Sequence, residues 1–183
     1  MDIEEIIACL NRAKEKLLLK DSYLLVNNAH DRTISQRLAV YLTEEFKEYD
    51  VDCEYNHVWG YKKYKHIEIL ISKCRSLNKK IHPKIEEQIK EGTLTEDSLI
   101  ELEIYPDIII HKRGSNDNLV VIECKKDYKL NPKDREYDEY KLSCCLGSEL
   151  NYYCGFFILF ETSGKKPNIL IQKTTCRGIL SDI

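Results

Sequence analysis

The chain has 183 residues, of which 43% are hydrophobic and 32% are charged, and its formal net charge is −3. This length and hydrophobic content predict one globular domain over residues 1–183 with a substantial core. No apolar stretch approaches the roughly 18 residues of a membrane span, and the first twenty residues do not resemble a signal peptide. We therefore expect a cytoplasmic protein with no membrane partner. The net charge gives no support for nucleic-acid binding, although a local basic groove would suffice for it.

Eight cysteines raise the question of disulfides or zinc. Cysteines normally stay reduced in the cytosol, and the chain has no C-x-x-C pair. Cys144 and Cys145 are adjacent, which favours packing over metal binding. The sequence therefore predicts neither a disulfide framework nor structural zinc.

The first predicted helix covers residues 2–19, because apolar side chains recur on one of its faces at helical spacing. This helix is expected to dock on the rest of the domain or on a second copy in a homodimer. A turn is expected near residues 20–22, and the apolar segment 23–26 has no clear assignment. A core helix follows over residues 31–46, with Ile34, Leu38, Tyr41, Leu42 and Phe46 on one face.

A strand is predicted over residues 51–55, where Val51, Cys53 and Tyr55 alternate with acidic side chains. The next segment, about residues 57–103, is too long for a plain loop and is expected to be a helical insertion. Its predicted helices cover residues 67–77 and 83–91, the second starting with proline and followed by Gly92.

Aromatic and basic side chains interleave at the start of this insertion, over residues 59–66. Such a pattern suits base stacking and phosphate contact, which makes Lys62, Lys63 and Lys65 candidate nucleic-acid contacts. The alternative is an ordinary solvated face with half-buried tyrosines.

Residues 107–111 and 119–124 predict a β-hairpin, because both are β-rich and the segment between them contains turn-forming residues. With the turn centred on Ser115, Asp107 faces Glu123, and His111 faces Leu119. The strand period of two places Lys125 on the face of both carboxylates and Cys124 on the other face. Two carboxylates so close together need a cation, a shared proton or solvent.

A hard cation such as Mg²⁺ prefers carboxylate and carbonyl oxygens, keeps several waters, and can acidify one of them beside a phosphate. Lys125 would then orient or deprotonate that water, if burial lowers its pKa, or would act through its charge alone. The residues therefore suggest metal-assisted hydrolysis of a phosphodiester.

Pro106-Asp107 followed by Glu123-Cys124-Lys125 resembles the motif of the PD-(D/E)XK nuclease superfamily, which includes restriction endonucleases and Holliday-junction resolvases. The resemblance implies an α/β fold with a restriction-endonuclease-like core, a mixed central sheet flanked by helices, over residues 27–160 outside the insertion. It implies that Asp107, Glu123 and the main-chain carbonyl of Cys124 bind Mg²⁺, or Mn²⁺ in its place, and that Lys125 assists the attacking water. The alternative is an exposed hairpin whose charges are simply solvated.

Members of this superfamily carry an acidic residue on the first core helix, often glutamate in an ER pattern. This chain has Asp31-Arg32, so Asp31 is either a third metal ligand or the cap of the helix. Glu45 also falls on the apolar face of that helix and is a rival third carboxylate.

Residues 132–146 predict a helix that ends at Gly147, and strands are predicted over residues 153–160 and 169–172. Lys141 on this helix is an auxiliary candidate for phosphate contact, as is Lys126 on the hairpin. The alternative for Lys141 is a surface ion pair with Asp138. His111 shares the face of Asp107, but a lone histidine is more often a hydrogen-bonded strand residue.

No HExxH motif, G-x-S-x-G elbow or glycine-rich phosphate loop is present. We therefore expect a magnesium-dependent nuclease that acts on DNA. The alternative is a catalytically inactive nucleic-acid-binding or assembly protein of the same fold.

Overall fold

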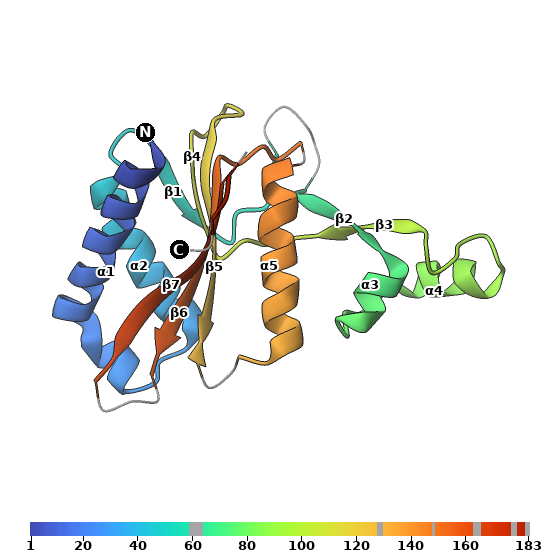
Figure 1. The fold of residues 1–183 in the computed structure, drawn as a ribbon, viewed down its shortest axis with the longest axis horizontal. Helices are drawn as coiled ribbons and strands as arrows, with labels where there is room; N and C mark the ends of the chain where they lie inside the picture. Colours follow the sequence, from blue (N-terminus) through green and yellow to red (C-terminus); the bar gives the residue numbers. More distant parts are fainter. Residues whose placement is uncertain (59–63, 128–129, 148, 163–165, 177–178, 182–183) are drawn as a thin grey trace.

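The computed structural model describes residues 1–58, 64–127, 130–147, 149–162, 166–176 and 179–181. It is an α/β protein in which two N-terminal helices and a later helix enclose a mixed β-sheet (Figure 1). Among the described residues, the strands of the main sheet lie side by side in the order in which they follow one another along the chain. Within these residues no helix is long and apolar enough to cross a membrane.

The helices are α1 (Ile3–Val26), α2 (Asp31–Glu45), α3 (Ile71–Ser76), α4 (Pro83–Lys90) and α5 (Pro132–Gly147). The strands of the main sheet are β1 (Asp50–Cys53), β4 (Ile108–His111), β5 (Asn118–Lys126), β6 (Cys154–Glu161), β7 (Asn168–Cys176) and β8 (Ile179–Ser181). Strands β5 and β6 are parallel and the other neighbouring strands are antiparallel. A parallel pair needs a crossover connection, and α5 provides it.

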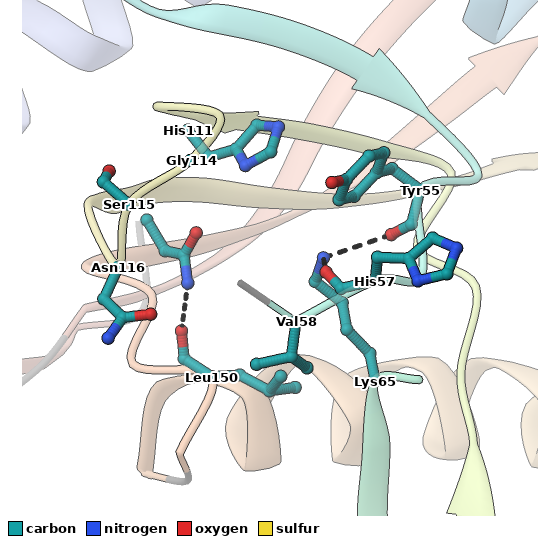
Figure 2. Close-up of a pocket in the computed structure, with 10 residues that line it drawn as sticks. Tyr55, His57, Val58, Lys65, His111, Gly114, Ser115, Asn116 and Leu150 are labelled. Carbon is teal, nitrogen blue, oxygen red and sulfur yellow. Dashed lines mark hydrogen bonds between the residues drawn. The ribbon is translucent and has the colours of Figure 1, made fainter. Parts of the chain in front are cut away.

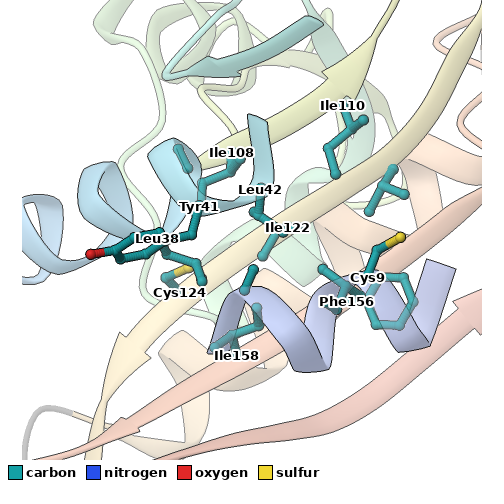
Figure 3. Packing of buried hydrophobic residues seen from close by; sticks show 14 of the residues in the cluster. Cys9, Leu38, Tyr41, Leu42, Ile108, Ile110, Ile122, Cys124, Phe156 and Ile158 are labelled. Atoms are coloured by element: carbon teal, nitrogen blue, oxygen red, sulfur yellow. The ribbon is translucent and has the colours of Figure 1, made fainter. Parts of the chain in front are cut away.

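Two hydrophobic layers cover the two faces of the sheet. On one face, α1 and α2 pack on the sheet, and Figure 3 shows Leu38, Tyr41 and Leu42 beside strand residues such as Ile108 and Ile122. On the other face, α5 packs through Leu142 and Cys145. Strand β5 lies between two strands and under helices on both faces, which explains its almost continuous burial.

The first helix is longer than its sequence pattern predicts. The expected turn at residues 20–22 is only a kink, where Asp21 has non-helical backbone angles, and the helix continues to Val26. The carboxylate of Asp21 accepts a hydrogen bond of 2.6 Å from Arg37 and another from the hydroxyl of Tyr41. These bonds tie the kink to α2, and residues 23–26 continue the helix beyond it.

The insertion is a projecting arm, and it is less helical than predicted. Strands β2 (His66–Leu70) and β3 (Leu99–Glu103) form a separate antiparallel ribbon that carries α3 and α4 at its far end (Figure 1). Residues 67–70, predicted as helix, are strand because buried Ile67 and Ile69 alternate with exposed side chains. The predicted second helix is present as α4, and Gly92 after it has a φ of +77°.

Candidate active site

The hairpin formed by β4 and β5 has the predicted register over most of its length. Ile109 pairs with Val121 and Ile108 pairs with Ile122, which brings Asp107, just before β4, level with Glu123. The register shifts after Ile110, so His111 pairs with Asn118 and not with Leu119 as predicted. The shift lies at the turn end of the hairpin and leaves the end with the carboxylates unchanged.

One open cleft contains the predicted acidic and basic residues. Its lining comes from the start of α2, the segment before β4, the end of β5, and α5, and includes Asp31, Asp107, Glu123, Lys125 and Lys141. Its volume of about 720 Å³ falls in the range of ligand-binding sites. The chain thus gathers residues from distant parts of the sequence at one end of the sheet.

Asp107 is fixed by the main chain of the neighbouring strand. Its Oδ2 atom accepts a 2.7 Å hydrogen bond from the backbone N–H of Cys124. Burial raises the pKa of Asp107, and the opposing effects of this hydrogen bond, Lys125 and Lys141 do not cancel the increase. The carboxylate is therefore well positioned but short of compensating positive charge.

Glu123 is buried, with 2% of its surface exposed, and forms an ion pair across to α5. Its Oε2 lies 2.9 Å from Nζ of Lys141, which also lies 2.8 Å from Oδ1 of Asp138. Burial raises the pKa of Glu123 to about 8, with added repulsion from Asp107 and Asp138, despite the attraction of Lys141. Burial would lower the pKa of Lys141, but Glu123 and Asp138 outweigh burial and raise it.

Lys125 shares Asp138 with Lys141. Its Nζ lies 3.1 Å from Oδ2 of Asp138. Burial would lower the pKa of Lys125, but Asp138, Glu123 and Asp107 outweigh burial and raise it. Lys125 therefore stays protonated, which favours an electrostatic role over proton abstraction.

Asp138 is the functional candidate that the sequence analysis missed. Asp138 is 3% exposed, and its carboxylate forms ion pairs with both lysines. The predicted Asp138–Lys141 pair is therefore present, but it is buried and does not lie on the surface. A signal was present in the sequence: Asp138, Leu142, Cys145 and Leu146 lie on one face of the helix, and all four are buried. An acidic residue in such a stripe indicates a buried partner.

Asp31 is the first residue of α2 and lines the cleft, but it is not the helix cap. The cap is His30, whose Nδ1 lies 3.2 Å from the backbone nitrogen of Arg32 and accepts its hydrogen bond. Arg32 lies at the rim of the cleft and forms a 2.7 Å ion pair with Glu54. Asp31 thus lines the same cleft as Asp107 and Glu123, and its Oδ1 lies 2.8 Å from Nδ1 of His30.

Two other candidates lie elsewhere. Glu45, the rival third carboxylate, forms 2.6 Å ion pairs with Arg12 and Lys16 and thus ties α2 to α1. His111, at the end of β4 away from Asp107, does not line the cleft either, and its Nε2 lies 2.9 Å from Oδ2 of Asp52 on β1. Both are accounted for by structural contacts.

The proposed nucleic-acid contacts Lys65 and Lys126 are both buried. Lys65 is 2% exposed and donates hydrogen bonds of 3.3 and 2.8 Å to the carbonyls of Tyr55 and His57 (Figure 2). Lys126 is 1% exposed and donates to the side-chain oxygen of Asn28 and the carbonyl of Ala29. Both ammonium groups are directed at oxygen atoms of the protein itself, and their contact with nucleic acid stays a prediction. Lys62 and Lys63 lie outside the described residues.

The chemistry of the donors fits a hard cation. Asp107 and Glu123 supply carboxylate oxygens, and Mg²⁺ is commonly held by one or two carboxylates with water in its other positions. Burial raises the pKa of the Cys124 thiol far above its ordinary value, so this residue can contribute only its main chain. Within the described ranges, no group of three or more His, Cys, Asp and Glu side chains is arranged around a metal position.

No family model, curated protein or solved structure matches this chain.

Proposed function

We propose that this chain is a magnesium-dependent nuclease that hydrolyses phosphodiester bonds in DNA and has a restriction-endonuclease-like core of the PD-(D/E)XK type. The observation that best supports this proposal is that Asp107, Glu123 and Lys125 line one cleft. Burial raises the pKa of both carboxylates. A divalent cation would relieve this shortage of positive charge. The resemblance of the motif and the order of elements around it point the same way.

Each residue has a definite part in this proposal. Asp107 and Glu123 would hold the cation, and Mg²⁺ bound there would supply an acidified water and neutralise charge on the phosphate. Lys125, kept protonated by its carboxylate neighbours, stabilises the negative charge that develops on the phosphate. Asp138 positions Lys125, and Lys141 neutralises part of the charge on Glu123.

The cleft also offers groups that suit a nucleic-acid strand. His30, Arg32 and Tyr105 line it together with the carboxylates. Tyr105 is 53% exposed, so its ring is available for stacking on a base. Arg32 is a candidate phosphate contact, with Glu54 as its partner in the free protein.

One observation favours the alternative of an inactive nucleic-acid-binding or assembly protein. The ammonium of Lys141 already contacts Glu123 and Asp138, so the chain partly neutralises its own carboxylates without a metal. In that case the centre would be a structural ion-pair network that joins α5 to β5.

Incubation with supercoiled, linear and branched DNA and with RNA, in Mg²⁺ or Mn²⁺, distinguishes the two functions. We expect metal-dependent cleavage that Asp107→Asn abolishes and the control Asp117→Asn leaves unchanged. Asp117 is an exposed residue of the same hairpin, paired with Lys112. Binding of DNA without cleavage in either metal would favour the inactive protein. Calorimetry with no heat of Mg²⁺ binding would overturn the metal centre itself.

A further inference from the structure

Two cysteines face each other across the β6–β7 pair. Cys154 begins β6 and Cys176 ends β7, and the two residues are direct partners in the antiparallel register. Both are free cysteines in the structure, and their Sγ atoms lie 2.9 Å apart. Because the two strands already fix this register, the sulfur atoms meet without any rearrangement of the fold.

The pair is enclosed in the core beneath α1 and α2. Cys154 has no exposed surface and Cys176 has 9%, and both belong to the hydrophobic cluster on that face of the sheet. A disulfide is roughly 2.05 Å long, so the sulfur atoms must approach by only about 0.9 Å. Directly opposed strand residues also meet the usual Cα separation for a disulfide.

We propose that Cys154 and Cys176 are a modification site, at which an intramolecular disulfide joins β6 to β7 when a small-molecule disulfide such as oxidised glutathione reaches them. This inference is independent of the proposed nuclease function. It also departs from the expectation, drawn from the sequence, that the cysteines stay reduced and form no disulfide framework.

The chemistry proceeds by two thiol–disulfide exchanges. One cysteine loses its proton, and its thiolate attacks a sulfur of oxidised glutathione, which releases one glutathione and leaves a mixed disulfide on the protein. The second cysteine, after losing its proton, attacks the protein sulfur of that mixed disulfide and releases the second glutathione. The two protein thiols thus lose two protons and two electrons, and one glutathione disulfide becomes two glutathione thiols.

Burial determines when the reaction occurs. It raises the pKa of Cys154, and the neighbouring thiol of Cys176 raises it further, so the reactive thiolate is rare in the folded protein. The oxidant must also reach a fully enclosed sulfur atom. The disulfide therefore forms readily while the chain folds and slowly once β6 and β7 are buried.

The test compares refolding with incubation of the native protein. Reduced protein is refolded from denaturant in a mixture of oxidised and reduced glutathione, alkylated, digested and analysed by mass spectrometry. We expect an intact mass, measured before alkylation, that is two hydrogens lower than that of the reduced protein, and a linked Cys154–Cys176 peptide after digestion. Native reduced protein in the same mixture should form this peptide at least about tenfold more slowly.

Variants separate this pair from the other cysteines. Cys154→Ser and Cys176→Ser should each abolish the linked peptide, whereas Cys74→Ser, at a buried cysteine of the arm, should leave it unchanged. The oxidised wild type should have a Tm higher than the reduced form by roughly 5–10 °C. If a serine variant does not fold, peptide mapping of the wild type still decides. Free thiols, stable glutathione adducts or linkage to Cys144 or Cys145 after equilibration would each overturn the proposal.

Discussion

The ammonium of Lys141 and the carboxylate of Glu123 lie 2.9 Å apart at the junction of α5 and β5, with little access to solvent. This contact has two consequences. It joins the helix to the central strand, and it places a positive charge beside the carboxylate that the proposed function assigns to a metal. Any cation bound by Glu123 must share that carboxylate with Lys141.

Replacement of Lys141 by methionine tests this sharing. The variant leaves Glu123 without an adjacent ammonium and leaves Asp138 with that of Lys125 alone, so the free energy of unfolding should fall by roughly 3 kcal/mol. Addition of Mg²⁺ should then raise Tm more in the variant than in the wild type, because the cation replaces the lost charge. Thermal unfolding with and without Mg²⁺ measures both effects. The control is Lys133→Met, at an exposed lysine of the same helix; an equal Mg²⁺ shift in all three proteins would contradict the idea.

Replacement of Lys125 by methionine should reduce the cleavage rate by roughly 10² to 10³, because the ammonium acts on charge that develops in the transition state. The affinity for Mg²⁺, measured by calorimetry, should stay close to that of the wild type, since Lys125 is not a ligand. Lys125→Arg keeps the charge and should recover part of the rate. Lys112→Met, at an exposed lysine of the hairpin turn, is the control. Full activity of Lys125→Met would remove this residue from the mechanism.

Asp138 should act through Lys125 and not on the substrate. Asp138→Asn should therefore lower the cleavage rate at least about tenfold, and the double variant Asp138→Asn/Lys125→Met should be no slower than Lys125→Met alone. Asp134→Asn, at a surface ion pair of the same helix with Lys79, provides the matched control. Independent, additive losses in the double variant would show that Asp138 has another role.

Lys65 should give the stability a recognisable pH dependence. Burial lowers its pKa from 10.5 to about 8, so in that interval the unfolded chain binds more protons than the folded one. The contribution of Lys65 to stability must then increase as pH rises from about 8 to 10.5. Urea unfolding of wild type and Lys65→Met across this range measures the difference between them. We expect the free energy of unfolding of the wild type to increase relative to that of Lys65→Met as the pH rises. Lys84→Met, at an exposed lysine of the arm, is the control and should show no such trend relative to the wild type.

The hairpin could be predicted from the sequence because the residues that determine its turn and its register are close together in the chain. Turn-forming residues around Ser115 set the register, and the period of two set the face that carries Glu123 and Lys125. The register shift at His111 could not be predicted in this way, since an irregularity of one residue leaves no clear pattern in the amino-acid sequence. The fold class was confirmed as α/β for a similar reason, as its helices and strands have strong periodic patterns.

The roles of the lysines were harder to predict because burial depends on the whole fold. Lys126 alternates with Lys125 along β5 and therefore points to the apolar face with Cys124, a signal that could have marked it as buried. For Lys65 no local pattern was available, because its partners, the carbonyls of Tyr55 and His57, come from an irregular segment. Asp138 was missed because the spacing of Asp138 and Lys141 is equally suited to a solvent-exposed pair.

The arm leaves and rejoins the main sheet at one point, since Cys53, the last residue of β1, pairs directly with Ile108, the first residue of β4. In topological terms β1 and β4 are a hairpin whose connection has grown into a ribbon with its own small core around Ile69 and Ile100. A change in the length of this ribbon would therefore leave the strands that hold the carboxylates in register. The contacts of the arm with α5, such as the ion pair of Lys79 with Asp134, tie it to the helix that carries Lys141.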